Sequence, residues 1–181
     1  FYVNSMVRQA HEQDTDIVLV DTGNSYEGLC EYFGGKYISY TEEHPITMNP
    51  FKIRREEWNI EKLGFLKNLV MLIWKGSQGT VSKTEDRMIE QVINEYYDAY
   101  FTTKRVSNLC FNSFYEFSTE RLPKICEENG LHGIDLSSYN YLLKEFYKGG
   151  SHDVTLNENM DSSLFDETFI VFEIDSIKDD P

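Results

Sequence analysis

The chain has 181 residues, enough for one full hydrophobic core or for a core with a smaller subdomain. Its formal net charge of −14 argues against a surface that binds nucleic acid over most of its area, because Lys and Arg must neutralise the phosphates. The three cysteines form no C-x-x-C pair and the four histidines lack zinc-ligand spacing, so free thiols and no metal site are expected. No apolar run reaches the roughly 18 residues that a membrane span requires.

The N-terminal quarter of the chain has the pattern of an α/β fold. Apolar residues at helical spacing predict a helix within residues 1–13, and the continuous apolar run Ile17–Val20 predicts a strand that is buried on both faces. A short helix is expected at 26–33 and an alternating strand at 36–40. Residues 41–51 contain two prolines and are expected to form a loop.

The middle of the chain has the pattern of a helical block. The expected helices are residues 60–75, one N-capped by Thr84, one opened by the capping box Ser113–Glu116, and one from Asp135 or Ser137 to Gly149. Pro123 argues against one unbroken helix up to Asn129. Tyr96 and Tyr97 lie on a stripe at helical spacing, which is typical of a core rather than of base stacking.

A second strand is expected at Phe169–Ile174, so the simplest architecture is an α/β sheet that carries an inserted all-α subdomain. The predicted domain boundaries place 1–57 in an α/β core, 58–150 in the all-α insertion, and 151–181 in the return to the core. The insertion is rich in Tyr and is expected to be acidic.

Two strands that each run into an acid are the strongest functional signal of the residues themselves. If the strands are parallel, Asp21 and Asp175 lie at the same carboxyl edge, where open α/β sheets bind ligands. A carboxylate there can hold a metal-bound water, act as a general base, or cap the following turn. For Asp21 alone the pattern favours the cap, and its neighbours Thr22 and Asn24 are also ordinary turn residues.

A complete phosphate-binding motif is missing from the sequence. The Walker A pattern G-x-x-x-x-G-K-[ST] would require a glycine in place of Cys30 and a Ser or Thr in place of Tyr37, on either side of Gly35-Lys36. A Walker B acid pair is also missing, because Thr22 and Ser176 follow the two acids. The chain is therefore not expected to hold Mg-ATP through these motifs.

Four stretches, taken together and in order, resemble one family. They are NSMVRQ, VLVDTGNSYEGLCE, GGKYISYTEEHPITMNPF, and FYKGG with LFDETFIVFEIDSIKD. The set is similar to the TraG-type ATPases of conjugative transposons from Bacteroides-like bacteria, which are relatives of the VirB-class ATPases of type IV secretion. The resemblance covers nearly the whole chain and is densest over residues 1–51 and 143–181.

The resemblance implies a partial RecA-like P-loop NTPase domain with parallel strands, from a cytoplasmic homohexamer that is peripheral to the inner membrane. The chain would be the interval between the Walker A and Walker B motifs. ATP and Mg are expected for the full-length parent, and neither is expected to bind this fragment, which should be inactive alone. Asp21 would orient the attacking water or the Mg shell. The rim of the nucleotide site would consist of Thr22, Asn24, Tyr26 and Asp175.

The expected function is therefore that of a piece of a conjugation motor, whose parent hydrolyses ATP to drive or assemble the DNA-transfer apparatus. Its expected partners are other subunits of that apparatus, with no direct DNA contact from this acidic segment. Arg54, Arg55, Arg105 and Arg121 are arginine-finger candidates, and no motif selects one. The alternative is a non-enzymatic helical adaptor module. Parallel, adjacent strands in one sheet would favour the motor.

Overall fold

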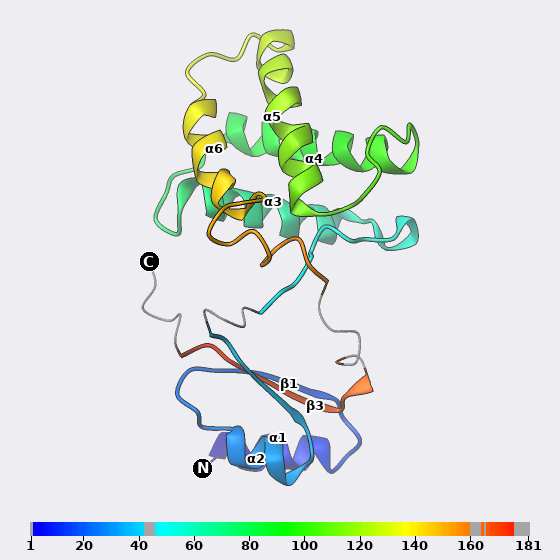
Figure 1. Cartoon of the computed structure of the whole chain (residues 1–181), viewed down its shortest axis with the longest axis vertical. Coiled ribbons are helices and arrows are strands. Elements are labelled where there is room, and N and C mark those ends of the chain that lie inside the picture. The colour runs from blue at the N-terminus through cyan, green and yellow to red at the C-terminus, as the bar shows by residue number, and fades with distance from the viewer. Residues whose placement is uncertain (1, 42–45, 160–163, 165, 176–181) are drawn as a thin grey trace. The chain divides into compact units, whose positions relative to one another are not determined.

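The structure is a computed structural model that describes residues 2–41, 46–159, 164 and 166–175. Residues 42–45 of the predicted loop lie outside the described residues, as do parts of the predicted return to the α/β core. The chain divides into two compact units, Phe1–Thr47 with Asn159–Pro181, and Met48–Glu158 (Figure 1). The first is an α/β unit and the second is helical.

The α/β unit contains a three-stranded parallel sheet. Its elements are α1 (Tyr2–His11), β1 (Ile17–Asp21), α2 (Glu27–Tyr32), β2 (Lys36–Ser39) and β3 (Phe169–Glu173). The strand order is β1-β3-β2, so the strand from the far end of the chain lies in the centre and pairs in parallel with both others. The predicted α/β fold with parallel strands is confirmed, and the two acid-ended strands are adjacent.

The helices α1 and α2 pack on one face of this sheet (Figure 1). The buried centre of the contact consists of Cys30, Phe169 and Val171. Side chains alternate along a strand, so Val18 and Val20 point to the other face, where they are 62% and 66% exposed. The prediction that this strand is buried on both faces is wrong for the described residues, because within this unit α1 and α2 cover one face and leave Val18 and Val20 exposed.

A glycine allows β2 to approach the central strand closely. A Cβ atom on Gly35 would lie 2.4 Å from the carbonyl oxygen of Phe169. Any larger residue at this position would therefore push β2 away from β3. On the helix-covered face, the ring of His11 packs edge-on against Phe33, with 4.4 Å between ring centroids.

The helical unit has an aromatic core. Its elements are the short 3-10 helix η1 (Arg55–Glu57), α3 (Ile60–Lys75), α4 (Lys83–Phe101), α5 (Phe111–Glu128), α6 (Leu136–Leu143) and the 3-10 helix η2 (Lys144–Phe146). Tyr96 and Tyr97 are buried, as predicted, and the Tyr97 hydroxyl donates to the Phe51 carbonyl at 2.8 Å. Phe51, Ile53 and Leu156 are buried in this core, which is why the unit extends beyond the predicted limits of 58 and 150.

Two helix boundaries differ from the predictions. The N-cap of α4 is Ser82 rather than Thr84, because Ser82 and Glu85 form a reciprocal capping box. Helix α5 begins at Phe111 and runs through Pro123 to Glu128. Leu122 and Ile125 on either side of the proline are buried, and their burial offsets the hydrogen bond that Pro123 cannot donate.

Among the helices formed by the described residues, none has both the length and the apolar character needed to cross a bilayer.

Candidate functional site

Two buried carboxylates lie together at the carboxyl edge of the sheet. Asp21 ends β1 and Glu173 ends β3, and the two residues are paired in register. Each is only 7% exposed. The backbone continues the pairing for one more step, since the N–H of Ile174 donates to the carbonyl of Asp21 at 2.9 Å. The edge predicted from the sequence therefore exists, with Glu173 rather than Asp175 opposite Asp21.

The side chain of Asp21 accepts three hydrogen bonds from the loop that follows it. Its Oδ1 accepts from the N–H of Thr22 at 2.9 Å. Its Oδ2 accepts from the N–H groups of Ser25 at 2.6 Å and Tyr26 at 3.1 Å. These contacts make Asp21 the cap of the turn that leads into α2, and both of its oxygens are engaged.

Glu173 holds the same loop from the neighbouring strand. Its Oε1 accepts from the N–H groups of Gly23 at 3.3 Å and Asp175 at 2.7 Å. Its Oε2 accepts from the N–H of Asn24 at 2.9 Å and from the Tyr37 hydroxyl at 3.1 Å. The Tyr37 hydroxyl also contacts Oδ1 of Asn24.

Every backbone N–H of residues 22–26, which we call the edge loop, therefore donates to one of two carboxylates. Gly23 has φ +141° and Asn24 has φ +58°, so both lie in the region that favours glycine or asparagine. This backbone turns successive N–H groups inward, and such a concavity binds anions. Here the anion is the protein's own Glu173 carboxylate.

The hydrogen bonds keep Glu173 ionised. Burial opposes its negative charge, but the N–H groups of Asn24 and Asp175 and the Tyr37 hydroxyl together hold the pKa of Glu173 below its usual value. Burial, and then the hydrogen bond to Glu173, raises the pKa of Tyr37 to about 12. At neutral pH the edge therefore contains a charged carboxylate and a neutral phenol that donates to it.

The structure brings the predicted site residues together on one edge. Thr22, Asn24 and Tyr26 belong to the edge loop, and Asp175 joins them through its backbone N–H. The sequence reasoning missed Glu173 and Tyr37. The signal for Glu173 was a charged residue within the apolar run FIVFEI, and no comparable signal marked Tyr37. Among the described residues, no group of three or more His, Cys, Asp or Glu side chains is placed to hold a metal ion.

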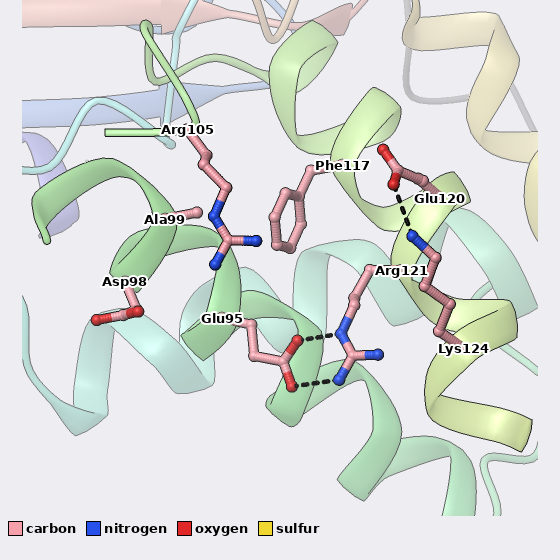
Figure 2. Close-up of a pocket in the computed structure, with 8 residues that line it drawn as sticks. All are labelled: Glu95, Asp98, Ala99, Arg105, Phe117, Glu120, Arg121 and Lys124. Atoms are coloured by element: carbon pink, nitrogen blue, oxygen red, sulfur yellow. Dashed lines mark hydrogen bonds and ion pairs between the residues drawn. The ribbon is translucent and has the colours of Figure 1, made fainter. Parts of the chain in front are cut away.

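The arginines considered as fingers lie in the helical unit. A cleft of about 610 Å³ is lined by residues of α4 and α5 and by Arg105 (Figure 2). Arg121 pairs there with Glu95 and, at 2.8 Å, with Glu128. The Nε of Arg105 donates to Oγ1 of Thr103 at 3.3 Å. Arg54 lies outside the cleft and pairs with Glu57.

The comparisons with known proteins agree with this fold. The family model described as the TraG P-loop domain matches residues 1–181. A solved structure, VirB4 of Thermoanaerobacter pseudethanolicus, is similar with a TM-score of 0.64 and 19% sequence identity. The match covers 98% of this chain and 47% of that chain, so this chain spans about half the length of that structure. A search of the curated proteins finds no match. By the family match over its whole length, the chain belongs to the TraG P-loop domain family.

Proposed function

We propose that this chain is part of an ATPase motor that drives or assembles a conjugative-transfer apparatus of the type IV secretion kind. The observation that carries the proposal is the parallel pairing of β1 with β3, which places Asp21 and Glu173 at one carboxyl edge. Ligands of open α/β sheets bind at such an edge. Membership of the TraG P-loop domain family and similarity to a VirB4 structure support the same function. The parallel pairing also favours the motor over a helical adaptor module.

The chain supplies the rim of an ATP site rather than its phosphate cradle. A cradle requires backbone N–H groups that are free to reach phosphate oxygens, together with a lysine. The N–H groups of the edge loop all donate to Asp21 or Glu173, and the sequence contains no G-x-x-x-x-G-K-[ST]. We therefore propose that the full-length protein that carries this chain binds ATP and Mg. The chain alone should not bind nucleotide tightly.

We propose that Asp21 contributes to catalysis by holding the edge loop in place. Both of its oxygens are engaged by backbone N–H groups, so direct orientation of the attacking water or the Mg shell would require it to release one of them. Thr22, Asn24 and Ser25 have exposed positions on the loop and form the proposed nucleotide-facing rim, together with Tyr26 and Asp175. Phosphoryl transfer depends mostly on positioning, so a displaced rim slows it.

The proposed motor is a homohexamer that is cytoplasmic and peripheral to the inner membrane, and it works with other subunits of the apparatus. Six nucleotide sites would then lie at or near subunit contacts. Sedimentation of the full-length protein with and without nucleotide measures this assembly. A protein that stays monomeric when ATP is bound would contradict the hexamer.

The test of the site is Asp21→Asn in the full-length protein. We expect turnover to fall by ~10-fold or more, because a displaced rim misplaces the reacting groups, while ATP still binds. Asp16→Asn is the matched control, because Asp16 is an exposed acid just before β1 at the opposite end of the strand. Unchanged turnover in Asp21→Asn with ATP binding intact would contradict the proposal.

A further inference from the structure

The negative charge of the chain is concentrated in the α/β unit. The segments 1–47 and 159–181 contain 3 Lys and Arg against 15 Asp and Glu. The helical unit, residues 48–158, contains 14 against 16. The insertion is thus close to neutral rather than acidic as expected. The near-zero net charge of the helical unit therefore leaves the positive potential of a local cluster of Lys and Arg largely intact.

Ion pairs between α3 and α4 separate the charges of α4. Glu85 bonds with Lys75 at 2.6 Å. Asp86 and Glu90 bond with Lys67 at 2.9 and 3.3 Å. The acids in the first half of α4 are thereby drawn to one side of the helix, against α3.

Two basic residues of α4 lie outside these ion pairs. Lys83 and Arg87 are exposed and lie one helical turn apart. Within the described part of the chain, neither bonds to a carboxylate in the structure. Lys83 is moreover the first residue of α4, where the helix dipole disfavours a positive charge. Neither an ion pair nor the helix dipole therefore stabilises Lys83 in this position.

These cations line a groove of about 290 Å³ that contains no acidic residue. Met88 of α4 and Ile125 of α5 form a buried apolar floor, at 2% and 1% exposed, and Leu131 is a half-buried apolar residue of the lining. The amide nitrogens of Gln91 and Asn129, which also line the groove, donate to Glu95 and to the Ile125 carbonyl. Each amide thus keeps a carbonyl oxygen that can accept a hydrogen bond from a peptide N–H.

The larger cleft of the same unit shows the opposite arrangement. There, Arg121 and Lys124 are neutralised by acids of the unit itself, Glu95 and Glu128 for the first and Glu120 for the second (Figure 2). These two cations are thus paired without a ligand, while Arg105 of the same cleft donates to Oγ1 of Thr103. The groove beside Lys83 and Arg87 differs from this cleft, because no acidic residue is among those that line it.

We propose that this groove binds an acidic peptide segment of a partner protein. Two carboxylates of the segment, about one helical turn apart, would pair with Lys83 and Arg87. An apolar side chain between them would pack against Leu131, over the buried floor that Met88 and Ile125 form. A peptide fits this surface better than nucleic acid does, because the groove offers only two cations and an apolar floor within a chain of net charge −14.

The experiment uses the chain with ¹³C-labelled Met and Ile methyl groups and a capped helical peptide of about three turns. The peptide carries two Glu at i and i+4 with a Leu between them, and a matched peptide has Gln in place of both Glu. We expect the acidic peptide to shift the methyl signals of Met88 and Ile125, and the Gln peptide to bind ~10-fold or more weakly. Added salt should weaken the binding of the acidic peptide and leave the weaker binding of the Gln peptide unchanged.

The charge-reversal variant K83E/R87E should lose binding by ~10-fold or more and should not be less stable, because Glu at the start of α4 suits the helix dipole. K52E/K62E is the matched control, with the same change of charge at two exposed lysines outside the groove. The neutral variant K83Q/R87Q should give an intermediate affinity. Equal binding by K83E/R87E, no shift at Met88, equal binding of the Gln peptide, or preference for a short single-stranded DNA would each overturn the proposal.

Discussion

Glu173→Gln tests how the edge loop is held. The carboxylate serves four donors, two on each oxygen, and glutamine supplies only one acceptor oxygen. If the amide nitrogen replaces Oε2, the Tyr37 hydroxyl can accept from it and donate to Asn24 Oδ1. The N–H of Asn24 is then left without its acceptor. An unsatisfied donor costs about 1–3 kcal/mol, and water reaches this exposed loop, so we expect about 1–2 kcal/mol.

The chain has a built-in probe for this loss. Cys30 is fully buried in the α/β unit, and Cys110 is buried in the helical unit. Thiol labelling of a buried cysteine requires local opening, so its rate follows the opening equilibrium. A loss of about 1–2 kcal/mol corresponds to labelling of Cys30 that is roughly 5–30-fold faster. Peptide mapping by mass spectrometry separates the two cysteines.

The rate at Cys110 should stay unchanged, because Glu173 belongs to the other unit. Equal acceleration of both cysteines would show global destabilisation and would contradict a local role of Glu173 in the edge loop. An unchanged rate at Cys30 would show that the four hydrogen bonds of Glu173 do not hold the edge loop in solution.

The remaining predictions concern the α/β unit. Gly35→Ala should speed Cys30 labelling, because its Cβ would overlap the Phe169 carbonyl, at a cost of about 1–3 kcal/mol; Gly28→Ala, which meets nothing within 4 Å, should not. His11→Phe should stabilise the unit by about 1 kcal/mol in urea unfolding, since the buried Nδ1 of His11 has no partner in the described structure; a lower urea midpoint would contradict this. The lowered pKa of Glu173 means that its contribution to stability is present above the ordinary glutamate pKa of about 4.3 and is lost as pH falls through the folded value. Hydrogen exchange in β1 should accelerate over that acidic range in the wild type, and less steeply in Glu173→Gln.

The strands and the acidic carboxyl edge of the sheet could be predicted because their signals are local. Apolar runs of strand length that end in acids identified β1 and β3. Apolar residues at helical spacing identified the helices between them. The partner of Asp21 could not be predicted in the same way. Glu173 lies opposite Asp21 because of the pairing register between two strands that are far apart in the sequence. The periodicity of each strand does not predict how the two strands are aligned.

Local rules failed where tertiary contacts outweighed them. Pro123 was expected to interrupt a helix, but the burial of Leu122 and Ile125 carries α5 through it. Ser82 rather than Thr84 caps α4 because Glu85 can bond to Ser82 and to Lys75 at once. The capping role of Asp21 was the interpretation that its local sequence favoured, and three hydrogen bonds support it.

Photocrosslinking tests whether the carboxyl edge of β1 and β3 faces the bound nucleotide. An ATP derivative with a photoreactive group on its γ-phosphate would be bound to the full-length protein, irradiated, and mapped by mass spectrometry, with excess ATP as competitor. If the carboxyl edge of β1 and β3 is the rim of the nucleotide site, the labelled peptides include residues 22–26 or Asp175, and competitor ATP removes the label. Specific labelling that falls elsewhere and never on these residues would contradict the account.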